Sequence, residues 1–210
     1  MGNRAVITTR KNFENDGVGV YLHWNGGYDS VSAFLKYCEL KGYRSPSEDS
    51  YGWARLCQVI ANFFGGGLSV GIDTVSNLDC DNWDNGVYII DGWRIVDRQF
   101  FHGLEQTVYS MEEMLLEIDR CMPKGERIGE FIQAKEVPTS EVKVGDTVFS
   151  PIWYDKPVKH KVVGFGSDKY VNGTNVKGMP YMDLYGDDYR GYDWNINNYI
   201  LTETVRIAPE

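Results

Sequence analysis

Helical spacing of apolar residues, three and four positions apart, recurs along the first part of the chain and stops at Pro123. A helix with this spacing buries one face, so it needs a partner layer. Beyond Pro123 the spacing is lost, and short β-type runs replace it. The chain therefore predicts two domains of different class, residues 1–123 and residues 140–210, joined by a charged linker at 124–139.

Three helices are expected in the first domain. Asp29 or Ser30 can cap the first, Asp49 or Ser50 can cap the second, and Ser110 with Glu113 forms the capping-box pattern of the third. Their apolar faces repeat at helical spacing. The residues expected to form the main core are Phe34, Leu35, Trp53, Leu56, Ile60 and Phe63.

Five β-type runs accompany these helices, at residues 5–9, 18–23, 68–73, 87–90 and 93–101. The last two are separated by Asp91-Gly92, a dipeptide that favours a two-residue type I′ hairpin. Helices alternating with groups of strands predict an α+β domain, with three helices against a mixed, antiparallel-rich sheet.

The second domain reads as all-β. Val142–Val148 is a turn that feeds a strand, and further strands are expected at 158–165, 181–184 and 199–207. The runs are short, with turn residues between them. We expect a small β-barrel or roll of SH3-like size.

Composition excludes several classes of function. The net charge of −9 argues against a direct nucleic-acid partner, because phosphate binding needs clustered Lys and Arg. No run approaches the ~18 apolar residues of a membrane span, and the charged N-terminus lacks a secretory signal, so a cytoplasmic protein is expected. The four cysteines are widely spaced with no nearby His, which speaks against zinc. No cofactor is predicted.

The first candidate site is the stretch His23-Trp24-Asn25, at the end of the second expected strand. Gly26 and Gly27 follow it, and such residues allow close approach of a ligand or of backbone. The three residues are predicted to border a ligand or partner site. The alternative is purely architectural: a strand end, a turn and the cap Asp29.

The acidic loop at 73–86 is the second candidate. Asp79, Asp81 and Trp83 are predicted to contribute to an interaction face. Carboxylates here could attract a hard cation, but the EF-hand frame places Asn82 where Gly is needed and Tyr88 where Glu is needed. No metal site is therefore assigned.

Aromatic and acidic residues also interleave in the second domain. Tyr189, Tyr192 and Trp194 are predicted as binding residues, since exposed Tyr and Trp dominate interaction hot spots. Alternating strand faces around a long hairpin loop would give the same pattern, and both interpretations stay open.

Two motifs, YLHWNGG at 21–27 and YGWARLCQVI at 51–60, together with the NRAVIT strand at 3–8, carry a resemblance. Over roughly residues 1–122 the chain resembles a group of uncharacterised accessory proteins of phages and mobile elements of Gram-positive bacteria. The group has no established activity, so the resemblance implies a genomic setting and no functional residues.

Two functions follow. The first is a non-enzymatic counter-defence protein that binds a host defence protein, such as a CRISPR effector, or sequesters a small nucleotide signal. The alternative is a small hydrolase of a nucleotide or nucleotide conjugate, with His23 and Asp29 as an acid/base pair. The sequence lacks a nucleophile motif, a phosphate loop and a metal-ligand set, which favours the binder, without a catalytic residue. The sequence does not determine the oligomeric state.

Overall fold

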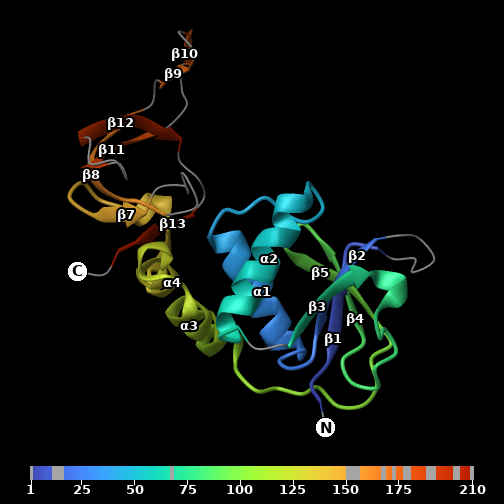
Figure 1. Cartoon of the computed structure of the whole chain (residues 1–210). Coiled ribbons are helices and arrows are strands. Elements are labelled where there is room, and N and C mark those ends of the chain that lie inside the picture. Colours follow the sequence, from blue (N-terminus) through green and yellow to red (C-terminus); the bar gives the residue numbers. More distant parts are fainter. Residues whose placement is uncertain are drawn as a thin grey trace. The chain divides into compact units, whose positions relative to one another are not determined.

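The structure is a computed structural model. It describes residues 2–10, 17–66, 69–149, 157–166, 169–171, 174–176, 181–187, 193–200 and 204–208. The chain divides into two compact units, Met1–Arg127 and Ile128–Glu210 (Figure 1). The first unit mixes helices and strands, and the second is mainly strand, so the protein is of mixed α+β class.

Every helix and strand expected in the first unit is present. In chain order the elements are β1 (Ala5–Thr8), β2 (Val18–Leu22), α1 (Tyr28–Leu40), α2 (Ser50–Phe63), β3 (Val70–Thr74), the 3-10 turn η1 (Val75–Asn77), β4 (Val87–Asp91), β5 (Arg94–Gln99) and α3 (Met111–Cys121).

The five strands form one sheet in the order β3-β2-β1-β4-β5. β1 pairs with β4 in parallel, while its other neighbour β2, and the outer pairs β2–β3 and β4–β5, are antiparallel. The prediction of a mixed, antiparallel-rich sheet is confirmed. All four residues of β1 are buried, because this central strand has layers on both of its faces.

The helices form one of these layers: α1, α2 and α3 contact one another, and α1 and α2 reach β5 and β3 (Figure 1). The other face is covered by η1 and the loop after it. There Val6 and Val87 pack with Val75, and Tyr21, Leu78 and Cys80 lie against them.

The predicted core is largely confirmed. Phe34, Leu35, Leu56 and Ile60 are at most 1% exposed, and Trp53 is buried. Phe63 is half-buried, so its assignment to the main core was wrong. It is the last residue of α2, at the border of the helix layer, and its ring packs edge to face against Phe34.

Two of the three predicted helix caps are confirmed. The Asp49 side chain accepts hydrogen bonds from the N–H groups of Tyr51 and Gly52, and Ser110 with Glu113 forms the capping box of α3. The cap of α1 was wrong, because Gly27 is its N-cap and Asp29 lies inside the first turn without capping.

The hairpin between β4 and β5 differs from the predicted register by one residue. Asp91 pairs with Arg94, so the two loop residues are Gly92 and Trp93. Gly92 takes a φ of 60° while Trp93 does not take a positive φ, which fits a type II′ turn rather than type I′.

The second unit begins with a short helix and continues as strands. Its elements are α4 (Gly129–Gln133), β6 (Lys135–Pro138), β7 (Thr147–Phe149), β8 (Lys159–Gly166), β9 (Lys169–Val171), β10 (Thr174–Val176), β11 (Tyr181–Asp187), β12 (Asp193–Ile200) and β13 (Thr204–Ile207). The 3-10 turn η3 (Thr139–Glu141) follows β6, whereas the 3-10 turn η2 (Lys124–Glu126) belongs to the end of the first unit. The fourth helix was not predicted, because five residues are too few to show a helical period.

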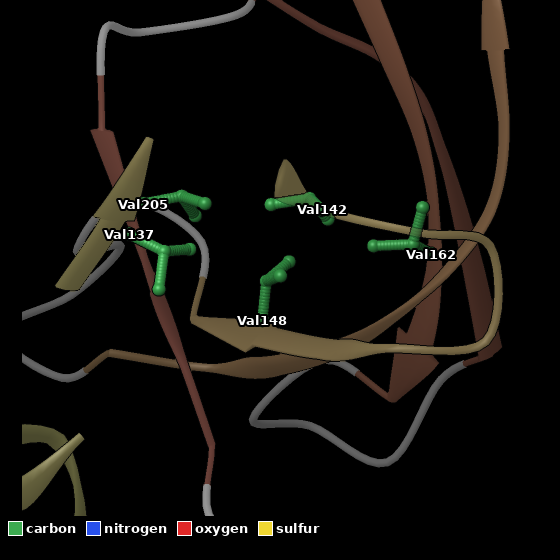
Figure 2. Close-up of a cluster of buried hydrophobic side chains, with 5 residues drawn as sticks. All are labelled: Val137, Val142, Val148, Val162 and Val205. Atoms are coloured by element: carbon green, nitrogen blue, oxygen red, sulfur yellow. The ribbon is translucent and has the colours of Figure 1, made fainter. Parts of the chain in front are cut away.

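Six of these strands form an antiparallel sheet in the order β12-β11-β8-β7-β13-β6. Its core is a cluster of five valines, Val137, Val142, Val148, Val162 and Val205 (Figure 2). Among the described strands β6 and β12 are the two edges of an open sheet, and no closed barrel forms. The SH3-like barrel therefore stays a prediction.

Candidate functional site

One end of the first sheet gathers four polar segments that lie far apart in the sequence. Residues 3–4 lead into β1 and residues 79–86 lead into β4, while residues 23–28 follow β2 and residues 100–106 follow β5. The parallel strands β1 and β4 start where the antiparallel strands β2 and β5 finish. The two candidate patches of the first domain therefore meet at one place, which we call the loop end of the first sheet.

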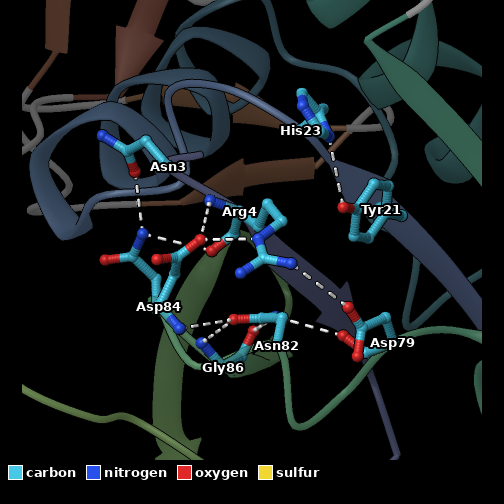
Figure 3. A network of polar contacts seen from close by, with 9 residues as sticks. Asn3, Arg4, Tyr21, His23, Asp79, Asn82, Asp84 and Gly86 are labelled. Atoms are coloured by element: carbon cyan, nitrogen blue, oxygen red, sulfur yellow. Dashed lines mark hydrogen bonds and ion pairs between the residues drawn. The ribbon is translucent and has the colours of Figure 1, made fainter. Parts of the chain in front are cut away.

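Arg4 is the central cation of the loop end. Its Nε lies 2.6 Å from Oδ2 of Asp84, and its Nη1 lies 3.6 Å from Oδ2 of Asp79 (Figure 3). Burial raises the pKa of the Asp84 carboxyl, but the hydrogen bonds and the charge of Arg4 lower it, and the net pKa lies below the ordinary value. Arg4 thus anchors the acidic loop to the start of β1.

Asn3 joins the acidic loop to the His23-Trp24-Asn25 stretch. Its side-chain oxygen accepts a hydrogen bond from the Asn85 side chain at 2.7 Å. Its own N–H donates to the carbonyl of His23 at 3.3 Å, and its carbonyl accepts from the N–H of Gly26 at 2.8 Å. Asn3 is buried, so these bonds form a fixed bridge.

Asn82 holds the acidic loop in one conformation. Its Oδ1 accepts hydrogen bonds from the N–H groups of Asp84 and Gly86, each at 3.1 Å. Its Nδ2 donates to the carbonyl of Asp79 at 3.1 Å. Asn82 is itself buried, and the loop turns around it so that Trp83 faces outward.

Trp83 is the most exposed aromatic side chain at the loop end, at 74%. Its ring stacks on His102 with centroids 5.1 Å apart and planes at 25°. Nε2 of His102 lies 2.9 Å from Oδ1 of Asp81. The structure thus brings Asp81 and Trp83, both predicted as site residues, to the same spot with a histidine that was not predicted.

The predicted stretch His23-Trp24-Asn25 lies at the surface. His23 is exposed, Trp24 is 45% exposed, and their rings meet edge to face at 4.9 Å. Nδ1 of His23 is 3.4 Å from the Tyr21 hydroxyl (Figure 3). Trp24 is therefore available to a partner and is not part of the core.

Gly26 and Gly27 serve the fold rather than a ligand. A Cβ at Gly26 would lie 2.7 Å from backbone atoms of Asn3 and Arg4, and one at Gly27 would lie 2.2 Å from the carbonyl of Gln106. Close approach of neighbouring backbone, rather than of a ligand, explains why both positions are glycine.

Left-handed backbone is concentrated at the loop end. Among the described residues, the non-glycine residues with positive φ are Asn25 at 54°, Trp83 at 56° and Phe100 at 55°. Asparagine tolerates this conformation, whereas a bulky residue there is an outlier that costs ~1–3 kcal/mol. Strain of this kind tends to gather at functional sites.

Arg98 and Glu105 organise the segment after β5, and neither was predicted. The Arg98 guanidinium donates to the carbonyl and side-chain oxygens of Asn85, each at 2.9 Å, and to Glu105 at 2.5 Å. It also lies over the rings of Tyr88 and Phe101, 4.6 and 3.7 Å from their centroids. Charged residues are common in sequences, and nothing local marked these two.

The proposed hydrolase pair is not assembled. Asp29 is in the first turn of α1, and no contact joins it to His23 within the described part of the chain. All four cysteines are free thiols. No group of three or more His, Cys, Asp or Glu among the described residues could hold a metal.

The remaining predicted site residues belong to the second unit. Tyr189 and Tyr192 lie outside the described residues. Trp194 is in β12, where its backbone pairs with Gly186, but its side chain also falls outside the description.

The comparisons with known proteins gave no relatives. No protein-family model matches the chain, and no match was found among curated proteins or solved structures. In the described residues, no helix combines the length and apolarity needed to cross a membrane.

Proposed function

We propose that the protein is a non-enzymatic accessory protein of a phage or mobile element, which inhibits a host defence protein by binding it through the loop end of the first sheet. The resemblance of residues 1–122 supports this setting. The binding surface consists of Trp24 and Trp83 with the neighbouring acids Asp79 and Asp81.

The observation that carries this proposal is the state of Trp83. Its backbone is in the left-handed region, and its side chain is 74% exposed. Burial of so small a part of the indole returns little free energy against a strain of ~1–3 kcal/mol. An exposed tryptophan on a rigid loop is instead the type of residue that dominates binding energy at protein interfaces.

Charge indicates the chemistry of the partner. The side chains of Asp79 and Asp81 are each 55% exposed, and the chain carries a net charge of −9. Acidic groups around an aromatic anchor attract a basic surface and orient it. Proteins that bind nucleic acid present such surfaces, and an inhibitor seated there would compete with the nucleic acid.

The proposal is tested by phage plating on hosts that each carry one defence system and express this protein. Active wild type should restore plating, Trp83→Asn should abolish restoration, and Tyr51→Ala should retain it. Tyr51 is a matched control, because it is 64% exposed but belongs to α2. Asparagine accepts left-handed backbone, so the fold is preserved. Equal activity of wild type and Trp83→Asn would refute the assigned surface.

A further inference from the structure

A second candidate site lies at the opposite end of the strands. It is a cavity of about 580 Å³ whose lining includes Thr9, Arg10, Ser47, Trp53, Asp91 and Val96. Thr9 and Arg10 follow β1 and Asp91 ends β4, so the cavity sits at the carboxyl ends of the two parallel strands. Ligands of open α/β sheets bind in crevices at such ends, and its volume falls within the roughly 300–1,000 Å³ of ligand sites.

One wall of the cavity is fixed by a buried hydroxyl. Thr8 is fully buried, and its Oγ1 donates to the carbonyl of Val18 at 2.9 Å and accepts from the N–H of Arg10 at 3.2 Å. The stem of Arg10 lies on Gly17, where an added Cβ would be 2.3 Å from Cγ of Arg10. The base of the Arg10 side chain therefore has a defined position at the rim.

The other wall is fixed by Ser47. Its Oγ accepts a hydrogen bond from the N–H of Gly92 at 3.0 Å, which ties the loop before α2 to the β4–β5 turn beside Asp91. Trp53, in the first turn of α2, is 9% exposed, and Val96 is 49% exposed. The lining of the cavity thus combines charged, hydroxyl and apolar side chains.

We infer that this cavity binds a nucleoside monophosphate. The side chains of Val18 and Val96, 42% and 49% exposed, offer apolar surface to a base. The guanidinium of Arg10 matches the geometry of a phosphate. The carboxylate of Asp91 can accept hydrogen bonds from ribose hydroxyls, as acidic residues do in dinucleotide sites.

The inference is independent of the proposed function, because the cavity and the loop end lie at opposite ends of the strands and share no residue. Loss of nucleotide binding and loss of plating restoration are therefore separate results.

Isothermal titration calorimetry of the full chain with the four common nucleoside monophosphates tests the inference. At least one should bind with a dissociation constant below about 1 mM. The matching nucleoside and inorganic phosphate should each bind at least tenfold more weakly, since each offers only part of the contacts.

Variants then assign the contacts. Arg10→Ala should weaken the nucleotide at least tenfold and leave the nucleoside unchanged, while Asp91→Asn should weaken both. Arg120→Ala is the matched control, an arginine with a 67% exposed side chain on α3. The inference is overturned if no nucleotide binds, if phosphate alone binds as tightly, or if Arg10→Ala binds like the control.

Discussion

Gly27 is the N-cap residue of α1, but its side-chain cap should be Glu105, which lies 77 residues from Tyr28 at the helix start. Its Oε1 accepts a hydrogen bond from the N–H of Tyr28 at 2.7 Å, and its Oε2 pairs with Arg98. Asp29, the cap predicted from the sequence, makes no capping bond. Replacing Glu105 with alanine removes the bond, the negative charge at the helix N-terminus and the ion pair together.

The expected cost is the sum of these contributions. Loss of a side-chain cap costs about 1 kcal/mol, and loss of an anion at a helix N-terminus costs about 0.5 kcal/mol. The Glu105 side chain is 36% exposed, so its pair with Arg98 adds only about 0.5 kcal/mol. Glu105→Ala should therefore lower the free energy of unfolding by about 2 kcal/mol.

Asp29→Ala is the matched control. It loses only the charge near the helix start and should cost about 0.5 kcal/mol. Glu105→Gln keeps an acceptor oxygen but loses the charge, so it should fall between the two variants. Urea unfolding followed by circular dichroism gives the free energies, and amide hydrogen exchange at Tyr28 reports the bond itself.

If Glu105 is the side-chain cap, Glu105→Ala should lower the free energy of unfolding more than Asp29→Ala does. If Asp29 is the cap, this order should be reversed. If Asp29→Ala costs as much as Glu105→Ala, or if Tyr28 exchanges at the same rate in Glu105→Ala and wild type, then Glu105 is not the cap.

Three further predictions concern the packing at Gly26 and the buried ionisable groups Asp84 and His160. Gly26→Ala should destabilise the first unit by about 1–3 kcal/mol, because its Cβ meets backbone. Gly125→Ala, with open space around it, should be near neutral in the same urea titration. The lowered pKa of Asp84 adds stability that is full above its ordinary value of 3.8 and is lost as the pH falls through the folded-state pKa. Asp84→Asn should reduce this loss of stability at acid pH. An unchanged dependence of stability on pH would contradict the role of Arg4. Burial lowers the pKa of His160, so the stability of the second unit should decline as the pH falls below 6.5, and His160→Leu should remove this dependence in thermal melts.

Local patterns accounted for most of the first unit. The helix-type and strand-type runs are set by contacts a few residues apart, and their elements appear where they were expected. Predictions that needed a distant partner were wrong: the acceptor at the start of α1 comes from Glu105, and Phe63 lies where the helix layer ends. α4 is too short to show a period.

Some residues of the candidate site could be predicted from the sequence, but their meeting at one place could not. Residues 23–25 stood out because polar and aromatic side chains adjoin at the end of an expected strand, and residues 79–83 stood out because aspartates gather around a tryptophan in one loop. Their convergence depends on the parallel pairing of β1 with β4, which no local pattern specifies. Arg4 and Arg98 act through partners that are distant in the sequence, so only the fold reveals them.

The pairing of β1 with β4 also constrains the order of events during synthesis. β1 pairs with β2, the next strand along the chain. The other edge of β1 stays unpaired until β4 has been synthesised and Val87 can pair with Val6. Non-local pairings of this kind form slowly, and open apolar edges attract other chains. A nascent chain that ends before β4 therefore presents the unpaired edge of its central strand, whose four residues are all buried in the folded protein. This interval of translation is the one in which chaperones or aggregation compete with folding.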